Sequence, residues 1–173
     1  MKLSHTSAAT LAVFDDPNLV SSAGLVPVLA LADRAGLRQL ADARLSVPTD
    51  RGSNAGLKVA SLVGGMLAGA DSIDDMALLR HGGMGRVFTG AYAPSTLGSF
   101  LRAFAFGHVR QLDAVASRFL TRLAEQSPLL GVGENEVVLV DVDDTIIEVH
   151  GYAKQGAGFG YSGVRGSTRC WPR

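Results

Sequence analysis

Apolar residues recur at steps of three and four along most of the chain, and this spacing is typical of helices with one buried face. Capping residues at the starts, and glycines or prolines at the ends, divide the pattern into segments. The sequence predicts helices over these ranges: 21–35, 37–47, 55–70, 71–80 and 95–126. Small residues dominate the third range, so we expect neighbouring backbones to approach that helix closely. Residues 1–20 are weakly patterned and are expected to be loop-like.

The last predicted helix carries a long apolar stripe together with a basic face. The stripe consists of Leu97, Leu101, Phe104, His108, Leu112, Val115, Phe119 and Leu123. Winding the helix at 3.6 residues per turn places Arg102, Arg110 and Arg118 away from the stripe and Arg122 at its rim. Such arginines either form an ordinary solvated face or contact phosphates, to which the guanidinium geometry is suited.

Two neighbouring residues qualify this prediction. Gly107 is a point at which the helix is expected to kink or break. His108 falls on the apolar stripe, so we expect a satisfied core histidine rather than a metal ligand. The short helices that precede the basic helix also permit a helix-turn-helix arrangement.

An unbroken aliphatic and β-branched run at residues 137–150 predicts a strand buried on both faces. Alternation puts Asp141, Asp143 and Thr145 on one face of that strand. Ionised carboxylates in such a strand are costly unless a cation or a proton offsets them. We therefore expect a divalent-cation site at Asp141 and Asp143, with Mg²⁺ as the best match to hard oxygen ligands. The alternative is that the acids form only the solvated end of a strand.

Charge is segregated along a chain that is neutral as a whole. The 173 residues are 47% hydrophobic, with a net charge of +0 and a pI of about 6.9, so global charge does not indicate a nucleic-acid binder. Residues 77–123, however, contain six arginines and one acid, whereas residues 134–148 contain six acids and no base. A basic helical block therefore precedes an acidic strand block.

We expect a soluble, cytoplasmic protein. The single cysteine, Cys170, excludes an internal disulfide framework and suits a reducing compartment. The longest uncharged apolar stretch, residues 59–70, is too short for a membrane span, and no signal peptide is evident.

Turn-forming residues organise the second half of the chain. Ser127 and Pro128 end the helical block, and residues 127–135 form a linker to the acidic strand. A glycine-rich turn then leads into a second strand expected near residues 159–164. The last residues, 167–173, lose the apolar patterning of a continuing strand.

A family resemblance extends this picture. The segment VVLVDVDDTIIEVHGYAKQGAGFGYSGVRG resembles the opening of the catalytic domain of DDE-type transposases of bacterial insertion sequences. The segments FDDPNLVSSAGLVPVLALADRAGL and YAPSTLGSFLRAFAFGHVRQL are similar to the N-terminal region of the same family, so the resemblance covers residues 14–166. It implies an α+β fold, in which a helical DNA-binding region at 21–126 precedes the first strands of an incomplete ribonuclease H-like domain at 136–166.

The resemblance also implies roles for individual residues. In that family the first strand carries the first of three metal-binding acids, with Thr or Ser two positions on; here that acid is Asp143, with Asp141 as an auxiliary. The three acids jointly hold two magnesium ions for in-line attack on a DNA phosphodiester. The family's second Asp and its Glu lie further downstream, so we expect an inactive, truncated form with an aberrant tail at 167–173. Such a chain would bind the element's terminal inverted repeats, form a homo-oligomer or pair with intact transposase and inhibit it.

A second, shorter resemblance uses the same acids. Residues 138–145 match the first motif of haloacid-dehalogenase-type phosphatases, an apolar strand followed by Asp-x-Asp-x-Thr. That resemblance implies Asp141 as the nucleophile and Asp143 as the general acid. The lysine and acidic motifs that such phosphatases carry later in the chain are not found here.

Overall fold

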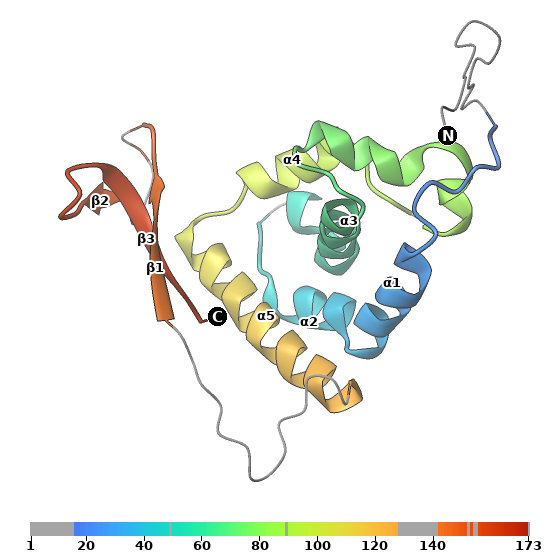
Figure 1. The fold of residues 1–173 in the computed structure, drawn as a ribbon, viewed down its shortest axis with the longest axis horizontal. Helices are drawn as coiled ribbons and strands as arrows, with labels where there is room; N and C mark the ends of the chain where they lie inside the picture. Colours follow the sequence, from blue (N-terminus) through green and yellow to red (C-terminus); the bar gives the residue numbers. More distant parts are fainter. Residues whose placement is uncertain are drawn as a thin grey trace, which may run out of the picture.

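The protein has an α+β arrangement in which a group of helices precedes a small antiparallel sheet. The computed structural model describes residues 16–48, 50–88, 90–127, 142–151, 153 and 156–172. The helical elements are α1 (Leu25–Arg34), α2 (Leu37–Arg44), η1 (Asp50–Gly52), α3 (Ala55–Leu67), η2 (Asp74–Arg80), η3 (Gly82–Arg86), α4 (Pro94–Arg102) and α5 (Phe106–Gln126). In Figure 1, α3 is seen nearly end-on with the other helices around it, and the sheet lies beside α5.

Helix α3 is in close contact with its neighbours because it carries glycines where they approach. A Cβ on Gly56 would overlap the carbonyl oxygen of Arg38 and lie 2.6 Å from Oδ2 of Asp42. A Cβ on Gly64 would lie 2.6 Å from Cζ of Phe88. The prediction that neighbouring backbone approaches this small-residue helix is therefore confirmed at the contact between α2 and α3.

The principal core lies where α2, α3, α4 and α5 meet. Its buried members are Ala32, Leu37, Leu40, Ala41, Leu45, Val47, Ala55, Val59, Phe100 and Val115. Leu112 and Phe119 of α5 pack against this cluster, so this part of the predicted apolar stripe faces the core. Leu101, which the sequence places on the same stripe, is instead 43% exposed. Burial of a side chain as large as Phe100 contributes about 1.5–3 kcal/mol relative to an exposed position.

The single helix predicted over residues 95–126 is in fact two helices, separated at residues 103–105. Phe104 lies in this break and packs edge-to-face against Phe100, with 5.0 Å between the ring centroids. The break therefore precedes Gly107, the residue at which the sequence places it.

His108 helps to begin α5 on the far side of this break. Its Nδ1 accepts a hydrogen bond of 2.9 Å from the backbone N–H of Ala105, which supplies the return half of a capping box. Its ring also lies edge-on to that of Phe104, with centroids 5.9 Å apart. His108 is thus a half-buried capping residue of α5, and not the core histidine that the sequence predicts.

The predicted helix at residues 71–80 is a 3₁₀ helix, η2. The backbone N–H and the hydroxyl of Ser72 both donate to Oδ2 of Asp75, at 2.9 and 2.7 Å. These hydrogen bonds lower the pKa of the Asp75 carboxyl, because they favour its ionised form.

The sheet has three antiparallel strands, β1 (Val142–Glu148), β2 (Gly158–Phe159) and β3 (Arg165–Pro172), in the order β1-β3-β2. Three expectations need correction. Ile147 of β1 is 51% exposed, so the strand is not buried on both faces. The main partner of β1 begins at residue 165, not within 159–164, and residues 167–172 belong to the sheet and do not form a tail outside it. The backbone ladder requires no apolar side chains, and Thr168, Cys170 and Trp171 are compatible with a strand.

No helix in the described part of the chain is long and apolar enough to cross a membrane.

Gly56→Ala should destabilise the helical region by about 2 kcal/mol or more, because the added methyl group meets backbone and a carboxylate. Gly107 supplies a matched control, since it is helical and exposed and a Cβ there would have nothing within 4 Å. Gly107→Ala should be neutral or stabilising by up to about 1 kcal/mol. Urea unfolding followed by circular dichroism measures both; equal effects would contradict the close contact of α2 with α3.

Candidate functional site

Of the two acids that the sequence predicts as metal ligands, only Asp143 lies within the described residues. Asp143 lies in β1, and its register partner in β3 is Trp171. Thr145, two positions along on the same face of the strand, is paired with Arg169. Asp141 lies outside the described residues.

The strand paired with β1 carries no acidic residue. A hard divalent cation needs several oxygen ligands, and a two-metal centre needs carboxylates from more than one element. β3 is hydrogen-bonded along the whole of β1, and its sequence, RGSTRCWP, contains two arginines and no acid. Among the described residues no three His, Cys, Asp or Glu side chains form a metal-binding group.

The four arginines predicted to contact DNA do not share one helix. Arg102 ends α4, and its Nη2 donates to the hydroxyl of Ser99 at 3.3 Å. Arg110 lies in the first half of α5 and forms an exposed ion pair with Asp113 at 3.8 Å. These two arginines flank the break between α4 and α5, whose three-residue length is within the range of helix-turn-helix connections.

Arg118 and Arg122 lie further along α5, towards the turn between α1 and α2. Arg118 is exposed and donates to the carbonyl oxygen of Ala114 at 3.0 Å. The guanidinium of Arg122 lies over Gly36, with Nη1 2.5 Å from the position that a Cβ would take. Gly36 has a φ of 82°, so this position requires glycine both for its backbone conformation and for the space that Arg122 occupies.

Hydrogen bonds at both ends show that α5 runs antiparallel to α2. Near the start of α5, Gln111 accepts from the backbone N–H of Ser46 at 2.9 Å and donates to its hydroxyl at 2.8 Å. Near the end of α5, Nε2 of Gln126 donates to the carbonyl oxygen of Arg34 at 2.9 Å. The C-terminal half of α5 therefore lies at the turn between α1 and α2.

This arrangement brings two further arginines to α5 that sequence reasoning missed. Arg34 is the last residue of α1 and Arg44 the last residue of α2, and both are exposed. They lie far from residues 77–123, so counting charge along the chain does not group them with the arginines of α5. The only local signal is their place in the last turn of a helix, where cations are favoured by the helix dipole.

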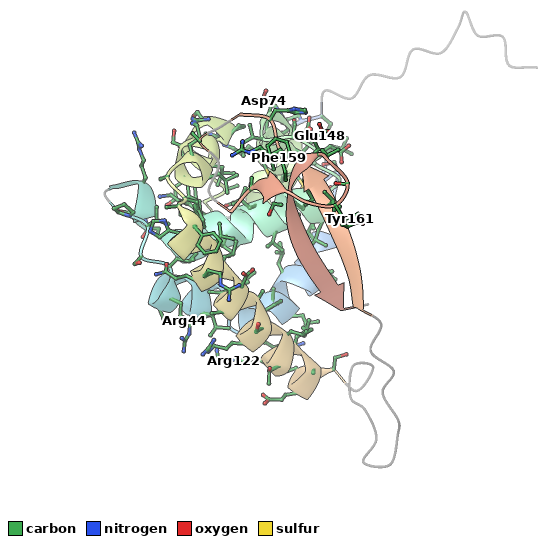
Figure 2. All side chains as sticks on the ribbon, turned by 90° about the vertical axis from the view of Figure 1, so that its left-hand side faces the viewer. Arg44, Asp74, Arg122, Glu148, Phe159 and Tyr161 are labelled. Carbon is green, nitrogen blue, oxygen red and sulfur yellow. The ribbon has the colours of Figure 1, made fainter. Side chains whose placement is uncertain are left out.

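Figure 2 shows Arg44 and Arg122 projecting from the same end of the helical region. Glu148, Phe159 and Tyr161, from the sheet and its connection, lie at the other end of that view. Arg44 and Arg122 thus lie at a distance from Glu148 in this view.

Lys58 is a buried cation that the sequence analysis did not single out. Its side chain in α3 is only 3% exposed, and its Nζ donates to the carbonyl oxygens of Arg51 and Ser53 at 2.7 and 2.5 Å. The ammonium group also lies over the rings of Tyr92 and Phe100, 5.5 and 5.4 Å from their centroids. Burial lowers the pKa of Lys58, and the carbonyls and rings offset part of its desolvation. Lys58 therefore ties residues 50–54 to the core.

A small cleft opens between α1, α2, α3 and residues 87–90. Leu29, Ser61 and Phe88 line it, together with the Asp33–Arg38 pair, whose two hydrogen bonds measure 2.7 and 2.5 Å. Its volume of about 110 Å³ is well below the roughly 300 Å³ at which ligand pockets begin. The cleft is too small to hold a nucleotide.

Comparison with protein-family models, with curated proteins and with solved structures finds no match to this chain.

The stability of the protein should depend on the protonation of Lys58. Its folded pKa lies below the unfolded value of 10.5, so between these two values the unfolded chain binds more protons. The free energy of unfolding of the parent, relative to Lys58→Met, should therefore rise with pH in that window, by at most about 1.4 kcal/mol per pH unit. Urea unfolding of both proteins between pH 7 and pH 10.5 checks the sign; a falling difference would contradict a lowered pKa.

Proposed function

We propose that the helical region binds double-stranded DNA as the N-terminal part of a DDE-type transposase, and that the 173-residue chain does not by itself catalyse strand transfer. The resemblance of residues 14–166 to that family supports the proposal. The observation that carries it is the exposure of arginines on the helical body, among them Arg44 and Arg122, which project from one end of it.

Arginine suits this function because its planar guanidinium presents several donors to phosphate oxygens and stays charged at all relevant pH values. Contacts of this kind supply affinity and orientation on the duplex, and they need no deep pocket. A binding surface made of exposed helical side chains is consistent with the small volume of the cleft among α1, α2 and α3.

The proposed lack of catalysis follows from the composition of the sheet. A two-metal mechanism needs carboxylates on several elements, whereas β3 brings arginines to the strand that carries Asp143. The chain would then act on DNA by occupying it, or by pairing with a catalytically intact transposase.

DNA binding should be detectable by fluorescence anisotropy with a 30-base-pair duplex. The logarithm of the association constant should fall linearly with the logarithm of NaCl concentration between 50 and 200 mM, with a slope of about −0.9 per phosphate contact. Gly107→Ala, which alters no charge, serves as the matched control and should bind like the parent. Absence of binding at 50 mM NaCl would refute the proposal.

Catalysis is tested separately, with the parent chain and an Asp143→Asn variant. With Mg²⁺ or Mn²⁺ present, neither protein should cleave a labelled duplex or hydrolyse a phosphomonoester such as p-nitrophenyl phosphate, because a single carboxylate strand does not assemble the metal site. Metal-dependent DNA cleavage by the parent, lost in Asp143→Asn, would show an active transposase centre. Phosphomonoester hydrolysis with the same dependence would favour a phosphatase.

A further inference from the structure

We infer that the DNA duplex lies against one part of the helical region, which we call the basic corner, and not against the junction of α4 and α5. The basic corner consists of Arg34, Arg44, Arg118 and Arg122, contributed by α1, α2 and α5. This inference rests on the proposed function and specifies the surface that performs it.

Three of these arginines are brought together by contacts between α5 and the end of α1. Gln126 of α5 donates to the carbonyl oxygen of Arg34. Arg122 lies one helical turn before Gln126, and its guanidinium covers Gly36. Arg118 lies one further turn back along the same helix. Successive turns of α5, at about 5.4 Å each, therefore present these cations beside the end of α1.

Arg44 extends the basic corner along α2. It ends that helix, close to Ser46, which is hydrogen-bonded to Gln111 of α5. From Gly36 to Arg44 the helix rises by about 12 Å at 1.5 Å per residue. A duplex carries one negative charge per about 1.7 Å of its axis, so a surface of this length faces several phosphates.

The cations of the basic corner are available to a ligand, whereas Arg38 and Arg110 already have carboxylate partners. Within the described structure, Arg34, Arg44 and Arg122 form no ion pair, and Arg118 bonds only to a backbone carbonyl oxygen. By contrast, Arg110 is paired with Asp113. A cation without a carboxylate partner gains more from a phosphate, because it gives up no existing ion pair.

The acids near the basic corner do not cancel its charge. Asp33 is bound by Arg38, and Asp42 accepts the backbone N–H of Gly56 at the start of α3, at 2.6 Å. Glu125 is exposed on α5, three residues after Arg122. Asp42 keeps its charge when it accepts a backbone N–H, so four arginines against Asp42 and Glu125 leave a charge of +2.

The cations at the end of α1 also have a structural effect that the test must separate from binding. Cations in the last turn of a helix interact favourably with its dipole. A lower affinity in an arginine variant is therefore informative only when the variant is folded, which its thermal unfolding curve shows.

The test compares two double variants that remove the same charge, Arg34→Gln with Arg44→Gln and Arg102→Gln with Arg110→Gln. Each is titrated by anisotropy with the 30-base-pair duplex used for the parent. The first double variant should reduce the salt slope by about 2, and weaken binding at 100 mM NaCl by about tenfold or more. The second should change affinity less than about threefold. Glu125→Gln should bind more tightly than the parent, because it removes the acid beside the basic corner.

The outcomes are distinguishable. If the salt slope falls only in the Arg102/Arg110 double variant, the duplex binds at the α4–α5 junction and not at the basic corner. The proposal that the protein binds DNA would then still hold. A slope that falls equally in both would also overturn it. Preference for single-stranded RNA over the duplex would overturn the choice of partner. If the parent does not bind the duplex at all, both the inference and the proposed function fail.

Discussion

The close contact of α3 with the helices around it is the constraint on which the rest of the helical region depends. Gly56 leaves room for the backbone of α2, and Gly64 leaves room for the ring of Phe88. With α2 held this closely, its buried face packs into the core that α5 completes through Val115. The positions of the arginines follow from this packing, because α5 can cover the core only by running along α2.

Buried polar groups reinforce the same arrangement. Lys58 places an ammonium group in the core and satisfies it with two carbonyl oxygens and two aromatic rings. A charge buried in this way is costly unless its partners are held in place. Because Lys58 is hydrogen-bonded to Arg51 and Ser53, the connector between α2 and α3 is part of the folded unit. In the sequence, residues 50–54 look like a polar loop.

The sheet obeys a different constraint. Its register is set by backbone hydrogen bonds between β1 and β3, and it places Asp143 opposite Trp171 and Asp144 opposite Cys170. Arg169 of β3 is opposite Thr145, so this register is not a pairing of acids with arginines. The functional proposal rests on the helices, which carry the exposed arginines.

Local patterns in the sequence were sufficient for most of the helices, the close-packed character of α3 and the core-facing stripe of α5. These features depend on residues within one or two turns of each other, and helical periodicity and side-chain size report them directly. The sequence likewise predicts a strand that includes residues 142–148, because a run of β-branched residues is typical of strands.

Contacts between distant residues had to be decided by the tertiary structure. The chain leaves the helical path at residues 103–105, which divides one predicted helix into two, and the pairing of β3 with β1 assigns residues 167–172 to the sheet. The grouping of Arg34 with Arg122 depends on α5 folding back along α2, across almost ninety positions of the chain. Periodicity within a segment shows which face of a helix is buried, but it contains no information about which other helix that face will meet. Only the packing of the whole helical region settles that choice.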